Sequence, residues 1–216
     1  MKTLTSALAF TVVTLAPGSA SATTYPGVEH NTAKLLQSLE GVPTLDSMKP
    51  VDARAALAGA QAAPQVALPA ADVSEKTIRV NGSDLKLTIV RPVGSQQKTL
   101  PAFMYFHGGG WVLGDFPTHE RLVRDLVVGS GAVAVFVNYS LSPEAAYGVA
   151  TEQAYAATKW VAEHGEDIKV DGTRLAVAGN SAGGEHYRRS CPDGEREGWT
   201  CTALASVAVP SDRFQF

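Results

Sequence analysis

The sequence predicts an α/β fold with a mostly parallel sheet, an antiparallel N-terminal edge and an N-terminal helical segment. Two segments that alternate between apolar and polar residues, 76–80 and 85–90, flank a turn sequence. Nearly continuous apolar runs follow at 102–106, 132–139 and 175–178, as expected of strands buried on both faces. Segments with helical spacing separate these runs, and this alternation favours right-handed parallel crossovers.

The composition is that of a globular protein and limits the kinds of partner. Of 216 residues, 45% are apolar and 18% charged, which excludes a disordered, collagen-like or coiled-coil chain. Because the net charge is -3, there is no electrostatic case for nucleic acid, and a neutral small molecule is the favoured partner. Cys191 and Cys201 are too few for a disulfide framework and lack the spacing of a zinc site. No metal or organic cofactor is expected, and the oligomeric state is left open.

Residues 1–22 have the pattern of a secretory signal peptide. Lys2 precedes an apolar run at 4–16, and Ala20-Ser21-Ala22 has the small-x-small form of a cleavage site. The run is shorter than the roughly 20 residues that a membrane span needs, so stable membrane insertion is not expected. We therefore expect a secreted protein, periplasmic or extracellular, with an N-terminal helix of the fold as the alternative interpretation.

Residues 23–75 are predicted to form an N-terminal helical cap or arm. Apolar residues have helical spacing at 28–39 and at 51–60, and glycine and proline interrupt the pattern around them. Two short helices are expected here. A lid over a site and an arm that only covers the core are equally compatible with this pattern.

The elements of residues 76–184 follow in order. Asn81-Gly82-Ser83-Asp84 is a hairpin signal between the two antiparallel strands. Thr118 is expected to cap a helix that ends at 129–131, and a second helix is expected at 149–164 with Gly165 as its stop. The residues expected to face the sheet are Leu122, Leu126 and Val127 in the first helix and Ala154, Ala157, Trp160 and Val161 in the second.

A candidate nucleophile follows the last apolar run. Gly179-Asn180-Ser181-Ala182-Gly183 stands between a predicted strand and a candidate helix, which is the setting of a nucleophile elbow. In such an elbow a sharp, strained turn holds the serine hydroxyl clear of the backbone. Ser181 is therefore the candidate nucleophile, and an ordinary glycine-rich turn is the alternative.

A second glycine-rich motif would supply the groups that stabilise a reacting ester. His107-Gly108-Gly109-Gly110-Trp111 follows the buried run 102–106, where an oxyanion loop belongs. Glycine allows backbone N–H groups to turn toward a developing oxyanion and leaves room for the acyl group. The expected donors are the amides of Gly108, Gly109 and Ala182.

With these motifs the chain resembles the hormone-sensitive lipase branch of the α/β-hydrolases, which contains carboxylesterases, lipases and small deacetylases. The matching segments are 107–111 for HGGGW, Tyr139, Leu141, Pro143 and Glu144 for Y-x-L-x-P-E, and 179–184 for GDSAGG, with Asn180 in place of the usual Asp. The resemblance covers about residues 76–184. It implies a serine hydrolase that acts on a small-molecule carboxylic ester.

The resemblance also implies supporting roles. In the family, the position of His107 braces the oxyanion loop and is not the general base. Gly110, Tyr139 and Glu144 are likewise expected to support the loops of the site rather than to react.

The resemblance ends before the catalytic acid and base, which in this fold follow the serine in the order Asp or Glu, then His. His186 is the only histidine after Ser181 and follows it by five residues, so on the same helix it is not expected to accept the serine proton. Residues 185–216 are expected to form a divergent tail, since 185–198 is too polar for the apolar helix of the family. The strand-like segment 200–209 therefore lacks a predicted covering helix.

Two functions remain open. In the first, the chain is a serine esterase with Ser181 and an oxyanion loop, although the α/β-hydrolase fold is incomplete and truncated after the elbow. In the second, it is non-catalytic, as a fragment or as a module that binds acyl groups. A peptidase or amidase on the same scaffold is a third alternative, which the HGGG loop disfavours.

Overall fold

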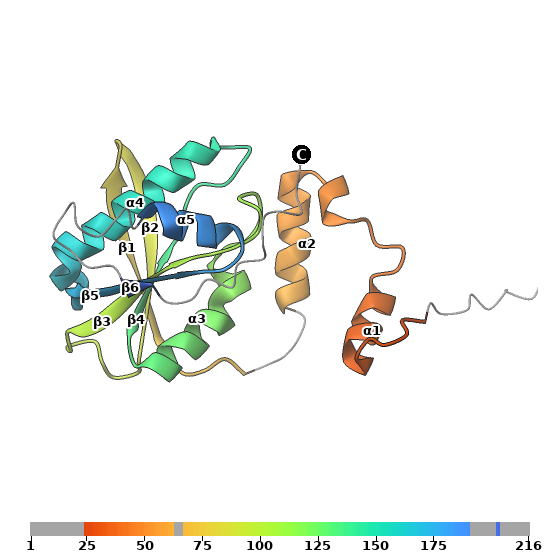
Figure 1. The fold of residues 1–216 in the computed structure, drawn as a ribbon, viewed down its shortest axis with the longest axis horizontal. Helices are drawn as coiled ribbons and strands as arrows, with labels where there is room; N and C mark the ends of the chain where they lie inside the picture. Colours follow the sequence, from red (N-terminus) through yellow and green to blue (C-terminus); the bar gives the residue numbers. More distant parts are fainter. Residues whose placement is uncertain (1–23, 63–66, 191–201, 204–216) are drawn as a thin grey trace, which may run out of the picture. The chain divides into compact units, whose positions relative to one another are not determined.

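The computed structural model describes residues 24–62, 67–190 and 202–203 (Figure 1). The expected signal peptide, residues 1–22, lies outside these ranges, as does most of the expected tail. In the described ranges, no helix is both long enough and apolar enough to cross a membrane.

The described chain divides into two compact units, with the boundary after Thr44. The first unit holds α1 (His30–Ser38), which Glu29 caps with its carboxylate. The second unit begins with a short 3-10 turn, Leu45–Ser47, and α2 (Pro50–Ala62). Both helices expected from the apolar spacing are therefore present.

A sheet of six strands forms the centre of the second unit, in the order β1-β2-β4-β3-β5-β6 (Figure 1). The strands are β1 (Asp72–Val80), β2 (Ser83–Arg91), β3 (Leu100–Phe106), β4 (Val133–Val137), β5 (Val170–Gly179) and β6 (Thr202–Ala203). β1 pairs with β2 and β2 with β4 in the antiparallel sense, and the other described pairs are parallel. The predicted fold class is confirmed.

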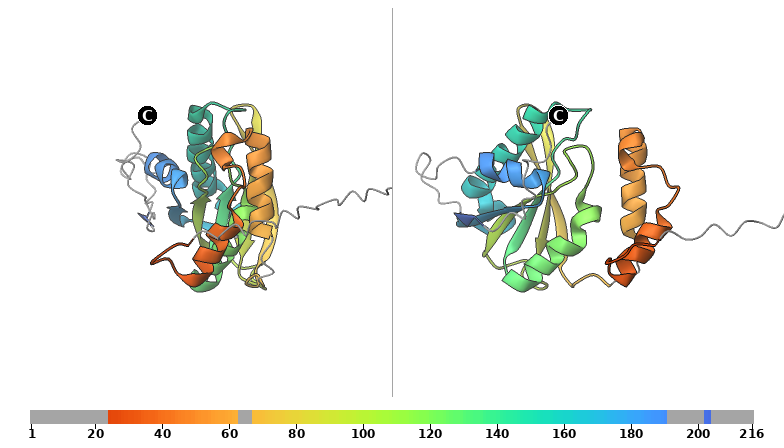
Figure 2. Two further views of the ribbon diagram at one scale, coloured as in Figure 1. Left: turned by 90° about the vertical axis from the view of Figure 1, so that its right-hand side faces the viewer. Right: turned by 45° about the vertical axis from the view of Figure 1, so that its right-hand side comes forward.

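Helices cover both faces of this sheet (Figure 2). α4 (Tyr147–His164) and α5 (Ala182–Ser190) lie on one face, and α3 (Phe116–Ser130) lies on the other. Successive side chains of a strand point to opposite faces. In β3, Phe103 and Tyr105 consequently pack with α3, whereas Met104 and Phe106 belong to the core beneath α4.

The start and the buried face of α3 differ from the prediction. Asp115 is the N-cap, and Thr118 completes a capping box with it from the first turn. The prediction of Thr118 as the cap was wrong because Asp115, three residues earlier, makes the reciprocal pair. The buried apolar residues of α3 are Val123 and Val127, and Leu122 and Leu126 are exposed. Only one stripe of a helix meets the sheet, and it contains Val127, as predicted, with Val123 in place of Leu122 and Leu126.

The chain also continues the fold beyond Gly184. α5 runs to Ser190, and β6 then pairs in parallel with β5. A helix therefore does precede the next strand, where no covering helix was predicted, and its His186 is buried although the segment is polar. The first turn of α5 needs little apolar side chain, because it packs by backbone: a Cβ on Gly183 would collide with the carbonyl oxygen of Phe106.

Candidate active site

Three loops that carry the sequence motifs meet at one edge of the sheet. β3, β4 and β5 are parallel, so the loops after their carboxyl ends lie at the same edge, where ligands bind in α/β folds. The loop after β3 begins with His107, the loop after β4 contains Tyr139 and Glu144, and Ser181 follows β5. Motifs far apart in the sequence thus become neighbours.

Ser181 occupies a sharp turn between β5 and α5. Its φ of 51° lies in the left-handed region, which a residue with a Cβ adopts only under strain. The turn is held by two backbone hydrogen bonds, from the Gly183 amide to the Asn180 carbonyl and from the Gly184 amide to the Ser181 carbonyl, both 2.9 Å long. Ser181 is exposed, so its hydroxyl is accessible, as in a nucleophile elbow.

The oxyanion loop is a tight turn that closes on Gly109. The carbonyl of Gly109 accepts hydrogen bonds from the amides of Leu113, at 2.8 Å, and Val112, at 3.2 Å. Gly109 has a φ of 119°, and a Cβ there would collide with the Leu113 carbonyl oxygen. Glycine is therefore required at this position.

Asn180 joins the oxyanion loop to the elbow. Its Oδ1 accepts hydrogen bonds from the Gly108 amide, at 3.0 Å, and from the hydroxyl of Tyr105, at 2.9 Å. A Cβ placed on Gly108 would lie 3.2 Å from the Cβ of Ser181. The glycine loop and the serine are thus side by side.

This bond also determines which amides remain for an oxyanion. Gly108 was one of the three expected donors, but in this structure its amide already donates to Asn180. Ala182 is the first residue of α5, and the first amides of a helix have no partner within it. The structure thus leaves the amides of Gly109 and Ala182 as the candidate oxyanion donors.

His107 lies beneath the loop as a neutral buried ring. It is 1% exposed and stacks on Tyr139 with ring centroids 4.3 Å apart. Burial lowers its pKa to about 4. Nδ1 lies 2.8 Å from the Gly108 carbonyl oxygen, and because a carbonyl only accepts, Nδ1 carries the proton. The Tyr139 hydroxyl donates to the His107 carbonyl at 2.6 Å.

His186 points into the core rather than toward solvent. Its ring is fully buried and packs edge-on against Phe106, at 6.2 Å, and Tyr139, at 4.7 Å. Ser181 is exposed, so the two side chains have different environments. Within the part of the chain that the structure describes, no cluster of three or more His, Cys, Asp or Glu side chains is placed to hold a metal ion.

Arg54 is a residue near the site that the sequence did not point to. It extends from α2 and forms a two-pronged ion pair with Glu144, with both N···O distances 2.8 Å. The hydrogen bonds from Arg54 hold the pKa of Glu144 down at about 2. No local sequence signal marks this pair, because 90 residues separate its members.

A serine on the turn after β5 and a glycine-rich loop after β3, on a mostly parallel sheet, define an α/β hydrolase. The family comparison agrees, since residues 103–188 match the family described as the alpha/beta hydrolase fold. Over these residues the chain therefore matches the α/β-hydrolase fold.

Its relatives include bacterial esterases. The chain is 50% identical over 93 residues to esterase LipI of Mycobacterium tuberculosis, covering 43% of this chain and 29% of that protein. It is 38% identical over 133 residues to carboxylesterase NlhH of the same species, covering 61% and 41%. The crystal structure of a thermostable esterase from Pseudomonas putida superposes with a TM-score of 0.76 at 55% identity, covering 84% of this chain and 57% of that one. The chain thus spans about half the length of these relatives, or less.

Proposed function

We propose that this chain carries the nucleophile and the oxyanion-binding groups of a serine esterase that acts on small carboxylic esters. The observation that carries the proposal is the neighbourhood of Ser181 and the glycine loop, with an ideal Cβ on Gly108 only 3.2 Å from the Ser181 Cβ. The names of the relatives, esterase and carboxylesterase, support the same chemistry.

In the proposed reaction the Ser181 oxygen attacks the ester carbonyl carbon. The hydroxyl proton passes to a general base or to water, the carbonyl oxygen becomes an oxyanion, and the amides of Gly109 and Ala182 donate to it. Collapse breaks the bond to the alcohol, which leaves with a proton, and water then hydrolyses the acyl-serine. Each oxyanion donor is worth about 3 kcal/mol of the barrier.

The proton of Ser181 determines how fast this site works. His107 is neutral and braced, and His186 is packed in the core, so neither suits the role of general base. In this fold the catalytic acid and base follow the serine along the chain. A histidine from that part of a hydrolase domain would take the Ser181 proton, and without it the rate falls by about four powers of ten or more.

Hydrolysis of p-nitrophenyl acetate tests the proposal. The chain should hydrolyse the ester faster than its Ser181→Ala variant, and p-nitrophenyl butyrate and longer esters would then separate an esterase from a lipase by acyl length. Equal rates for the two proteins would retire the esterase and favour the alternative, a non-catalytic fragment or a module that binds acyl groups.

The location of the protein is a separate proposal. Lys2, the apolar run at 4–16 and the small-x-small sequence that ends at Ala22 support secretion to the periplasm or the medium. N-terminal sequencing of the protein expressed from its full reading frame should find Thr23 as the first residue. A mature protein that still begins with Met1 would contradict the signal peptide.

A further inference from the structure

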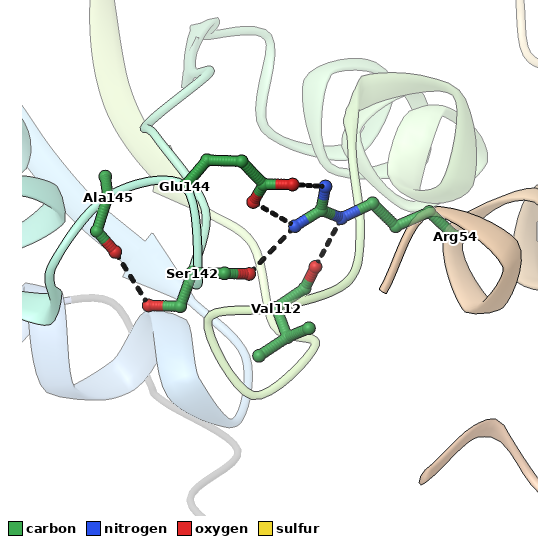
Figure 3. Close-up of polar contacts among 5 residues, drawn as sticks. All are labelled: Arg54, Val112, Ser142, Glu144 and Ala145. Carbon is green, nitrogen blue, oxygen red and sulfur yellow. Dashed lines mark hydrogen bonds and ion pairs between the residues drawn. The ribbon is translucent and has the colours of Figure 1, made fainter. Parts of the chain in front are cut away.

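Arg54 connects α2 to two loops of the site (Figure 3). Nε donates to the carbonyl of Val112 at 2.7 Å, and Nη2 donates to the carbonyl of Ser142 at 2.8 Å. Both terminal nitrogens also donate to the carboxylate of Glu144, at 2.8 Å each. A planar guanidinium with this many fixed acceptors holds them in one geometry, which a lysine ammonium does not reproduce.

The bond from Arg54 to Val112 reaches the oxyanion loop itself, because Val112 belongs to the turn that closes on Gly109. The amide of Val112 donates to the carbonyl of Gly109 at 3.2 Å, so Arg54 holds one side of a peptide turn whose other side is the oxyanion glycine. The two loops are also bonded directly, from the Ser142 amide to the Trp111 carbonyl at 2.8 Å. Arg54 therefore fixes both loops from outside while this bond joins them.

We infer that Arg54 is a positioning residue: it holds the turn 109–113 so that the Gly109 amide faces the oxyanion. The inference rests on the proposed function for the role of that amide. Arg54 contacts loop backbone and Glu144 in this geometry, and no substrate contact is assigned to it. On this account, the helical segment before the sheet does more than cover the core, because α2 supplies a residue that orders the site.

Hydrogen exchange measured by mass spectrometry on the full chain tests the inference without turnover. In Arg54→Ala, the amides of 109–114 should exchange at least about tenfold faster, whereas those of β3 and β4 keep their wild-type rates. Arg54→Lys should exchange there more than about threefold faster than the wild type but more slowly than Arg54→Ala, since it keeps the charge and loses the fork. Unchanged exchange at 109–114, or equal acceleration across β3 and β4, would overturn the inference.

Two further variants keep the test sound. Arg79→Ala is the matched control, since Arg79 also pairs with a carboxylate, Asp84, and a carbonyl, that of Gly82, but at an exposed hairpin. It should leave 109–114 unchanged. Glu144→Gln retains the bonds from Arg54 to Val112 and Ser142, so it should stay within about threefold of the wild type. If Arg54→Ala does not fold, Arg54→Lys and Glu144→Gln decide the matter, and equal exchange in these two would overturn the inference.

The split between kcat and KM is a second measurement, which the loss of a purely structural residue would not change. With p-nitrophenyl acetate, Arg54→Ala should lower kcat about tenfold and change KM less than about threefold, because the oxyanion forms only in the transition state. An unchanged kcat would overturn the inference. If the wild type hydrolyses the ester no faster than Ser181→Ala, the proposed function is overturned instead. The hydrogen-exchange rates would still show whether Arg54 orders the loop.

Discussion

The backbone amide of Gly108 donates to the side-chain Oδ1 of Asn180 over 3.0 Å. This bond joins the loop after β3 to the turn that carries Ser181, and it occurs at the one position where GDSAGG has a different residue in this chain. Because the hydroxyl of Tyr105 donates to the same oxygen, Asn180 supplies the acceptor on which both depend.

Replacing Asn180 tests this junction. Asn180→Ala leaves the Gly108 amide and the Tyr105 hydroxyl without their acceptor and should lower the free energy of unfolding by about 1–3 kcal/mol in urea titrations. Asn180→Asp keeps an acceptor oxygen at the same place, so it should lose less. If the aspartate variant loses as much as the alanine variant, the acceptor is not what stabilises the junction.

The Tyr139 hydroxyl is expected to stabilise the start of the oxyanion loop. Tyr139→Phe removes its bond to the buried His107 carbonyl and should lower the free energy of unfolding by about 1 kcal/mol or somewhat more. Tyr25→Phe is the control, because the Tyr25 hydroxyl bonds to Glu40 at an exposed position. If Tyr25→Phe lowers the free energy of unfolding as much as Tyr139→Phe does, the Tyr139 hydroxyl does not stabilise the loop in this way.

Gly183 and Gly59 form a matched pair for the packing of the elbow. A Cβ at Gly183 would collide with the Phe106 carbonyl, whereas a Cβ at Gly59 in α2 meets nothing within 4 Å. Gly183→Ala should therefore destabilise by at least about 2 kcal/mol, and Gly59→Ala should stabilise by about 0.5–1 kcal/mol. Thermal unfolding measures both, and a neutral Gly183→Ala would show that the elbow does not pack against β3 in this way.

His107 should make stability depend on pH. Its pKa falls from 6.5 to about 4 on folding, so the unfolded chain binds the proton more tightly. The neutral His107 ring makes its full contribution to the free energy of unfolding above about pH 6.5. This contribution is lost as the pH falls toward 4, by up to about 3 kcal/mol. Burial also lowers the pKa of His119, which adds a loss of the same sign.

Urea titrations across this pH range measure the effect. His107→Gln should remove most of the slope and leave only the part due to His119 and the carboxylates. An identical slope in wild type and variant would mean that the His107 ring is not buried as a neutral group.

Much of the fold follows from local sequence. Asn81 and Gly82 have positive φ values of 49° and 81°, as a two-residue hairpin turn requires, and the sequence predicts this turn directly. The parallel pairing of β3 with β4 and β5 also follows, since apolar runs separated by helices favour parallel crossovers. The buried stripe of α3 does not, because which side of a helix meets the sheet depends on strands elsewhere in the chain.

The site divides in the same way. Ser181, Gly109 and Ala182 belong to motifs whose spacing reflects local backbone geometry, so the sequence identifies them as candidates. The use of the Gly108 amide by Asn180, and the reach of Arg54 to Glu144, depend on segments that only the folded sheet brings together. The candidate helix after Ser181 is present as α5, but the sequence does not show how so polar a helix packs, because it does so partly through glycine backbone rather than through an apolar face.

The proposed reaction requires an accessible Ser181 hydroxyl beside the amides of the glycine loop. The most direct measurement is mass spectrometry of the full chain after prolonged exposure to a fluorophosphonate, which phosphonylates serine with loss of fluoride and places its phosphonyl oxygen where the oxyanion would lie. A single adduct on the peptide that contains Ser181, absent from Ser181→Ala, is the predicted result. An unmodified wild-type chain, or adducts spread over other residues, would contradict it.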